Sequence, residues 1–190
     1  MTGLELARAY WETYGEPMIR EQFPAYEGII AAALTGSGSE CYGFDDEVSR
    51  DHDFEPGFCL FIPGEEIVDR RTAFLLERAY AKLPAEFEGF RRQKLQPVGG
   101  QRHGVFRIDE YFTEKIGTSV EKITTEQWLR LPEYALAEAV NGEVFRDDAG
   151  LLTDCRKQLS EMPEDIRRKR LAGRLLLMAQ SGQYNYRRCL

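Results

Sequence analysis

The chain has few of the residues that build metal or disulfide sites. It contains four cysteines and two histidines: Cys41, Cys59, Cys155, Cys189, His52 and His103. The cysteines are far apart and no two have the CxxC spacing, which argues against a zinc site. Scattered thiols without a paired spacing are typical of a reducing compartment, so we expect a cytoplasmic protein.

The chain also lacks an apolar stretch of membrane length and a basic-then-apolar leader, in agreement with that expectation. Its 25 basic and 32 acidic residues give a net charge of −7. Nucleic-acid binding usually leaves a basic footprint, so nucleic acid is not an expected partner. Hydrophobic residues make up 43% of the chain, which is enough for a folded core.

The charges are unevenly distributed along the chain. Six of the residues between 45 and 55 are acidic, against the single basic residue Arg50. The C-terminal third is basic, with a cluster at 167–170. We interpret this cluster as the solvated face of a helix, with an anion site as the alternative.

Apolar periodicity predicts several helices. The first covers 4–14 and ends at Gly15, and Pro17 opens a short second helix that stops near Pro24. A helix over 65–83 should turn Ile67, Val68, Phe74, Leu75, Ala79 and Leu83 inward. Further helices are predicted over 109–116, 124–130, 133–140, 151–161 and 163–181.

Strands are predicted between these helices. Residues 29–34 form an apolar run of strand length, 103–108 form a further strand, and 143–145 form a short extended piece. Residues 51–62 are predicted to form one strand interrupted at Pro56 and Gly57. The order predicts an α/β (α+β) fold, with an α/β core over 1–116 and a helical half over 117–190.

The most informative segment follows the apolar run at 29–34. Gly36, Ser37, Gly38 and Ser39 form a small-residue turn, whose backbone N–H groups could bind phosphate. A flexible loop is the alternative, because such sequences are common in linkers. No Gly-Lys-Ser/Thr follows, so the turn is not a P-loop.

Asp51 and Asp53 follow this turn by about a dozen residues. On a strand, the period of two would place both carboxylates on one face, where a cation would relieve their repulsion. The alternative is a pair of solvated carboxylates. A calcium loop is excluded because Pro56 and Ile62 stand where glycine and glutamate are needed, whereas Mg²⁺ suits one or two carboxylates with phosphates.

This pattern resembles the minimal nucleotidyltransferase superfamily, which includes DNA polymerase beta. The string from Gly38 to Gly57 is similar to a narrower bacterial family of nucleotidyltransferase-like proteins described as a domain of unknown function. Other similar segments extend the resemblance over nearly the whole chain. They are Tyr10-Trp11, Gln22 to Pro24, Trp128 to Glu133, Gly142 to Asp147, Arg156 to Leu159 and Ala179 to Asn185.

The resemblance implies a small mixed sheet with flanking helices and a helical C-terminal cap. It implies transfer of a nucleoside monophosphate, with AMP expected, from ATP or another NTP to an unidentified small-molecule or macromolecular acceptor. Asp51 and Asp53 would hold Mg²⁺ or Mn²⁺, and Gly36 to Ser39 would bind the triphosphate. The alternative is a nucleotide-binding or protein-interaction module that has lost catalysis.

The chain departs from the family pattern at three points. His52 replaces an apolar residue between the aspartates. The third carboxylate of the superfamily would be Asp109, which could equally be the N-cap of a following helix. Relatives continue beyond the equivalent of Leu190, which implies a shortened chain. Arg102 and His103 are interpreted as a surface turn, with contact to phosphate as the alternative.

Overall fold

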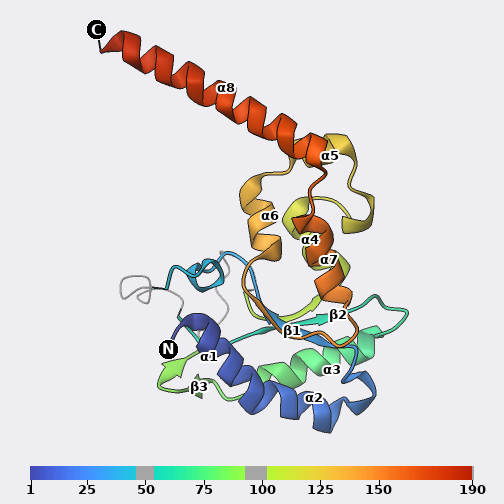
Figure 1. The fold of residues 1–190 in the computed structure, drawn as a ribbon. Coiled ribbons are helices and arrows are strands. Elements are labelled where there is room, and N and C mark those ends of the chain that lie inside the picture. The colour runs from blue at the N-terminus through green and yellow to red at the C-terminus, as the bar shows by residue number, and fades with distance from the viewer. Residues whose placement is uncertain (46–53, 93–101, 190) are drawn as a thin grey trace.

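The structure is a computed structural model that describes residues 1–45, 54–92 and 102–189, and its fold is mixed α/β (Figure 1). The central sheet has the order β5-β2-β1-β6. Its strands are β1 (Ala31–Leu34), β2 (Cys59–Ile62), β5 (Gly104–Arg107) and β6 (Glu143–Arg146). Strand β1 is antiparallel to β2 and β6, whereas β2 and β5 are parallel. The predicted fold class is confirmed.

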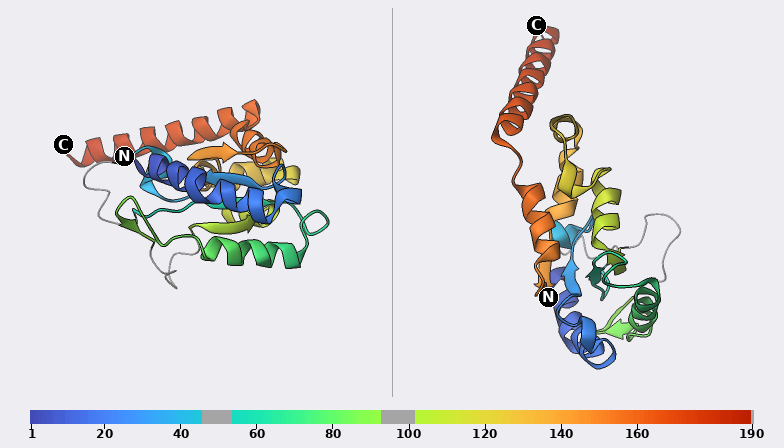
Figure 2. Two further views of the ribbon diagram at one scale, coloured as in Figure 1. Left: turned by 90° about the horizontal axis from the view of Figure 1, so that it is seen from below. Right: turned by 90° about the vertical axis from the view of Figure 1, so that its right-hand side faces the viewer.

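Helices cover both faces of the sheet. Figures 1 and 2 show α1, α2 and α3 on one face, and α4, α6 and α7 on the other. The helices are α1 (Gly3–Tyr10), α2 (Glu16–Gln22), α3 (Arg70–Ala81), α4 (Ile108–Ile116), α5 (Thr125–Arg130), α6 (Glu133–Val140), α7 (Leu151–Ser160) and α8 (Glu164–Arg188). Shorter elements are the π-helical η1 (Trp11–Gly15), the 3₁₀ turns η2 (Pro24–Tyr26), η3 (Ser39–Tyr42) and η5 (Val120–Lys122), and the hairpin strands β3 (Glu86–Phe87) and β4 (Phe90–Arg91).

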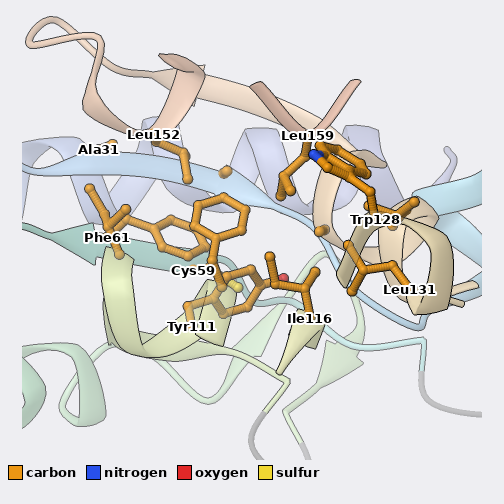
Figure 3. Close-up of a cluster of buried hydrophobic side chains, with 14 of the residues drawn as sticks. Ala31, Cys59, Phe61, Tyr111, Ile116, Trp128, Leu131, Leu152 and Leu159 are labelled. Carbon is orange, nitrogen blue, oxygen red and sulfur yellow. The ribbon is translucent and has the colours of Figure 1, made fainter. Parts of the chain in front are cut away.

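The two central strands are buried on both faces, which explains why their sequences are uninterrupted apolar runs. Side chains of Ala33 and Phe61 join the cluster under α4 to α7, which Figure 3 shows in close-up. Their neighbours Ala32 and Leu60 join the second cluster, under α1, α2 and α3. Alternation along each strand therefore distributes side chains between two cores, with no polar face.

The first two helices are joined rather than separated. Gly15 was predicted to end a helix, but η1 carries the helical backbone directly into α2. The helix is wider at this point, because the N–H of Glu16 donates to the carbonyl oxygen of Trp11, five residues earlier. Pro17, which has no N–H to donate, follows directly in the first turn of α2. The predicted break at Gly15 is wrong.

Helix α3 begins later than predicted and buries a different face. Asp69 caps it by accepting a hydrogen bond of 2.7 Å from the N–H of Thr72. The buried side chains of α3 are those of Leu76, Ala79 and Tyr80. Phe74 and Leu75, which were predicted to point inward, are 56% and 46% exposed. Ala79 is buried as predicted, but the core-facing side of the helix carries Leu76 and Tyr80 with it instead of Phe74 and Leu75.

The segment before β2 is held by a tyrosine. The hydroxyl of Tyr80 donates to the carbonyl oxygen of Phe58 at 2.7 Å and accepts from its N–H at 3.2 Å. Residues 54–58 are not a strand, so the predicted strand begins only at Cys59. Asp51 and Asp53, which were predicted to begin it, lie outside the described residues.

Helix α8 is attached only near its start. Ile166 is its one buried residue, and Arg170 donates to the carbonyl oxygen of Trp128 at 2.6 Å. Arg170 and Arg174 both pair with Glu133 at the start of α6. Beyond this attachment the helix projects from the rest of the structure (Figures 1 and 2). In the basic cluster, Arg167 and Arg168 are exposed, as interpreted from the sequence, whereas Arg170 is only 11% exposed and pairs with Glu133.

None of the helices within the described ranges is long and apolar enough to cross a membrane. The C-terminal half supplies β6 to the sheet as well as the helices. The division into units at residue 117 stays a prediction.

The contact between Tyr80 and Phe58 gives a first prediction. Replacing Tyr80 by Phe removes the oxygen that, among the described residues, accepts from the N–H of Phe58, whereas the Phe58 carbonyl keeps a second donor in Gly104. Chemical denaturation should show a loss of about 1–3 kcal/mol in the free energy of unfolding. Tyr134→Phe, at a side chain that is 69% exposed, is the control and should change it little. Equal effects of the two variants would contradict the role of Tyr80.

Candidate functional site

The candidate site lies at one edge of the sheet and is placed there by strand direction. Strand β1 runs against its neighbours, so its C-terminal end lies beside the starts of the other three strands. Ala33 pairs with Cys59, Cys59 with Gly104, and Leu34 with Glu143. The turn that leaves β1 therefore meets the segments that enter β2, β5 and β6.

The side chain of Asn141 fixes this turn. Its Oδ1 accepts a hydrogen bond of 2.9 Å from the N–H of Gly36, and its Nδ2 donates to the carbonyl oxygen of Gly36 at 2.6 Å. The hydroxyl of Thr35 lies 3.1 Å from the same Oδ1. The φ of Gly36 is +128°, a conformation that favours glycine. The backbone of the turn is thus held from the segment between α6 and β6.

The residues around Asn141 are themselves fixed. Gly142 donates its N–H to the carbonyl oxygen of Cys41 at 2.9 Å, and its φ is +69°. A Cβ at this position would overlap the carbonyl oxygen of Leu34, so only glycine fits. Arg156 of α7 donates to the carbonyl oxygens of Val140 and Asn141 at 2.8 and 2.9 Å. Burial lowers the pKa of this guanidinium.

A small pocket of about 50 Å³ lies beside the turn. Its lining residues are Leu34, Thr35, Ser37, Gly38, Glu40, Cys41, Arg102, His103, Phe106, Tyr111, Glu114 and Lys115. They include two permanent cations and two carboxylates, together with hydroxyl groups and a histidine. Such a lining can bind a small, strongly polar group, and the volume admits about one phosphate-sized group or a few waters but not a nucleoside.

Three polar side chains of the pocket, those of Arg102, Lys115 and His103, each lie close to a carboxylate. Arg102 Nη2 lies 2.7 Å from Glu40 Oε1, and these side chains are 25% and 14% exposed. Lys115 Nζ lies 3.2 Å from Oε2 of Glu138 on α6. His103 Nδ1 lies 3.3 Å from Oε1 of Glu55. The pocket is therefore polar and nearly balanced in charge.

Two glycines allow these side chains to approach the backbone. A Cβ at Gly57 would meet the ring of His103, and a Cβ at Gly38 would meet Glu40 and Arg102. The hydroxyl of Tyr111 closes another side of the pocket near Gly36. Burial raises the pKa of this tyrosine, so its hydroxyl stays protonated.

The predicted phosphate-binding turn divides into two parts. Ser37 and Gly38 line the pocket, and within the described ranges their amides have no protein acceptor. The amide of Gly36 is bonded to Asn141 and faces protein instead. Ser39 begins η3 and is not one of the lining residues. The turn therefore lies beside a pocket, not all of its amides are available to a ligand, and phosphate binding stays a prediction.

Of the three predicted carboxylates, Asp109 alone lies within the described residues. Asp51 and Asp53 lie outside the described residues, so their grouping stays a prediction. Asp109 is exposed in the first turn of α4 and is not one of the pocket residues. Arg107 takes the N-cap position, so the N-cap interpretation of Asp109 is wrong. Within the described ranges, no three histidine, cysteine or acidic side chains are grouped as metal ligands.

Sequence reasoning missed several residues of the site. Arg102 and His103 line the pocket, although a plain surface turn was the favoured interpretation. Glu40, Lys115 and Asn141 were not singled out. The Asn-Gly pair at 141–142 is a recognised turn signal, but nothing local indicates that its side chain binds a turn 105 residues away.

The comparisons with known proteins identify one family. Residues 128–190 match a family described as a domain of unknown function (DUF4037). The match covers about a third of the chain and includes Asn141 and Arg156. No curated protein and no solved structure matches the chain.

The two hydrogen bonds between the Asn141 side chain and the backbone of Gly36, called the clamp below, give a second prediction. Asn141→Ala removes both partners of the Gly36 backbone and should lower the free energy of unfolding by about 1–3 kcal/mol. Asn141→Asp should be at least as damaging, because a carboxylate oxygen would face the Gly36 carbonyl. Denaturation of both variants, with the exposed Asn185→Ala as control, measures the effect. Wild-type stability of Asn141→Ala would contradict the clamp.

The cysteines give a third prediction. Burial raises the pKa of both the Cys41 and the Cys59 thiol to about 12. The thiolate is the reactive form, so both thiols should resist iodoacetamide at pH 8 in the native protein, whereas the exposed Cys189 should react. Peptide mass spectrometry after timed alkylation, with a urea-denatured control, measures this. Modification of Cys41 as rapidly as Cys189 would show that the turn opens readily.

Proposed function

We propose that this protein is a Mg²⁺-dependent nucleotidyltransferase. It would transfer a nucleoside monophosphate, with AMP from ATP expected, to an unidentified acceptor. The observation that carries the proposal is the pocket at the end of β1, which Ser37 and Gly38 line together with the cationic residues Arg102 and Lys115. Backbone amides and cationic side chains are the groups that proteins use to bind phosphate oxygens.

The size of the pocket fits part of such a substrate. About 50 Å³ accommodates one phosphate group of a triphosphate, so the nucleoside would lie outside it. The clamp by Asn141 supports this assignment, because a turn that is already fixed loses little conformational entropy when it binds.

The metal would be held by Asp51 and Asp53, since carboxylate oxygens are ligands that Mg²⁺ prefers, and Mn²⁺ would suit the same groups. When bound, the ion would neutralise part of the negative charge on the phosphate oxygens. The chain's own contribution would be to hold the polyphosphate at the turn. An acceptor oxygen would then bond to the α-phosphorus as the bond to pyrophosphate breaks.

A second candidate is a nucleotide-binding or protein-interaction module without transferase activity. It is favoured by the position of Asp109, which is exposed and outside the pocket lining, whereas the resemblance implies a third carboxylate near the other two. The two candidates differ in whether ATP is consumed.

The test is release of pyrophosphate from ATP. Asp51→Asn and Asp53→Asn should each abolish Mg²⁺-dependent release and leave the melting temperature equal to or above that of wild type, because the change relieves carboxylate repulsion. Asp165→Asn, at an exposed position in α8, is the matched control. A wild-type rate in either aspartate variant would refute the assignment. Binding of ATP by the wild type, without release across a panel of acceptors, would favour the second candidate.

A further inference from the structure

The carboxylate of Glu40 lies in the part of the pocket where an anionic ligand would bind. Glu40 belongs to the same turn as Ser37 and Gly38, and its carboxylate lies 2.7 Å from the guanidinium of Arg102. We propose that the Glu40 carboxylate occupies the position of a polyphosphate oxygen, and that such a ligand binds by displacing it from Arg102. The proposal rests on the proposed function, and it makes the Glu40 carboxylate compete with the ligand for Arg102.

The geometry places the pair at the turn itself. A Cβ on Gly38 would overlap both Glu40 Oε1 and Arg102 Nη2, so the ion pair lies directly against the backbone of Gly38. A ligand oxygen bound to the Gly38 amide and to Arg102 would therefore be close to the Glu40 carboxylate. Two anionic groups at that separation repel each other strongly, so one of them has to leave.

The side chain of Glu40 has the freedom to leave. Its Cβ is held by α1, because a Cβ on Gly3 would overlap it, so the stem is fixed in place. The carboxylate lies several bonds further out and is 14% exposed, so rotation about the side-chain torsions can carry it toward solvent. The exchange therefore requires a change of rotamer and no change of backbone.

The charge balance makes the effect of Glu40 measurable. Of the permanent charges that line the pocket, Arg102 and Lys115 are balanced by Glu40 and Glu114. Replacing Glu40 by Gln removes one negative charge from the lining and leaves a side chain of almost unchanged size. If the carboxylate competes with the ligand, the neutral variant should bind an anion more tightly. If Glu40 serves only to position Arg102, the variant should bind it equally or less tightly.

The experiment is calorimetric titration with inorganic pyrophosphate, without divalent ions, at fixed ionic strength. Glu40→Gln should bind about tenfold more tightly than wild type, which corresponds to the removal of one partly screened like charge. Glu126→Gln makes the same change in net charge at a side chain that is 71% exposed, and it should match wild type within about twofold. Equal or weaker binding by Glu40→Gln would overturn the proposal, as would absence of binding in both wild type and variant.

A second variant keeps the proposal testable if Glu40→Gln fails to fold. Glu40→Asp keeps the charge but shortens the reach toward Arg102, so it should bind pyrophosphate with an affinity between those of wild type and Glu40→Gln. Affinity below wild type in a folded Glu40→Asp protein would count against displacement. Circular dichroism melts of each variant establish that it is folded.

The outcome is separable from that of the proposed function. Tighter pyrophosphate binding by Glu40→Gln in a protein that never releases pyrophosphate from ATP would support the competitor and refute nucleotidyl transfer. Release of pyrophosphate that depends on Asp51, with no gain in binding by Glu40→Gln, would support transfer and refute the competitor.

Discussion

The direction of β1 is the constraint on which the site depends. Because this strand runs opposite to the three others, one edge of the sheet collects the end of one strand and the beginnings of three. The residues of the pocket come from three stretches of the chain, 34–41, 102–106 and 111–115, and this topology brings them together. Had β1 run parallel to β2, the turn at Gly36 would lie at the opposite edge, away from Arg102 and Asn141.

The second requirement is that the turn itself be rigid. Asn141 supplies partners for both backbone groups of Gly36, and Arg156 in turn holds the backbone at Asn141. This chain of contacts links α7, the start of β6 and the end of β1. It also gives a structural meaning to the matched family segment at 128–190. That segment contains Asn141 and Arg156, which support the turn, and not the turn itself.

Much of the architecture could be predicted from local patterns. The apolar run at 29–34 and most of the helices after residue 108 appear near their predicted places, because each has a clear period and clear boundaries. The errors have local causes. Gly15 is compatible with a helix when a wide turn precedes a proline, and the cap at Asp69 starts α3 at Arg70 instead of near residue 65. Of the predicted site, Ser37 and Gly38 line the pocket, and their binding of phosphate stays a prediction. The predicted site lacked Asn141, Glu40 and Lys115, because contacts across long sequence separations leave no periodic signal.

The π-helical turn at Trp11–Gly15 has a consequence for the spacing of the N-terminal chain. Such a turn holds one residue more than a regular turn, and every residue of a regular helix adds a rotation of about 100°. Deleting one residue here, for example the exposed Glu12, would restore ordinary winding and leave Met18 and Ile19 facing the sheet. Ordinary winding with every residue retained would instead rotate Met18 and Ile19 by about 100° away from it.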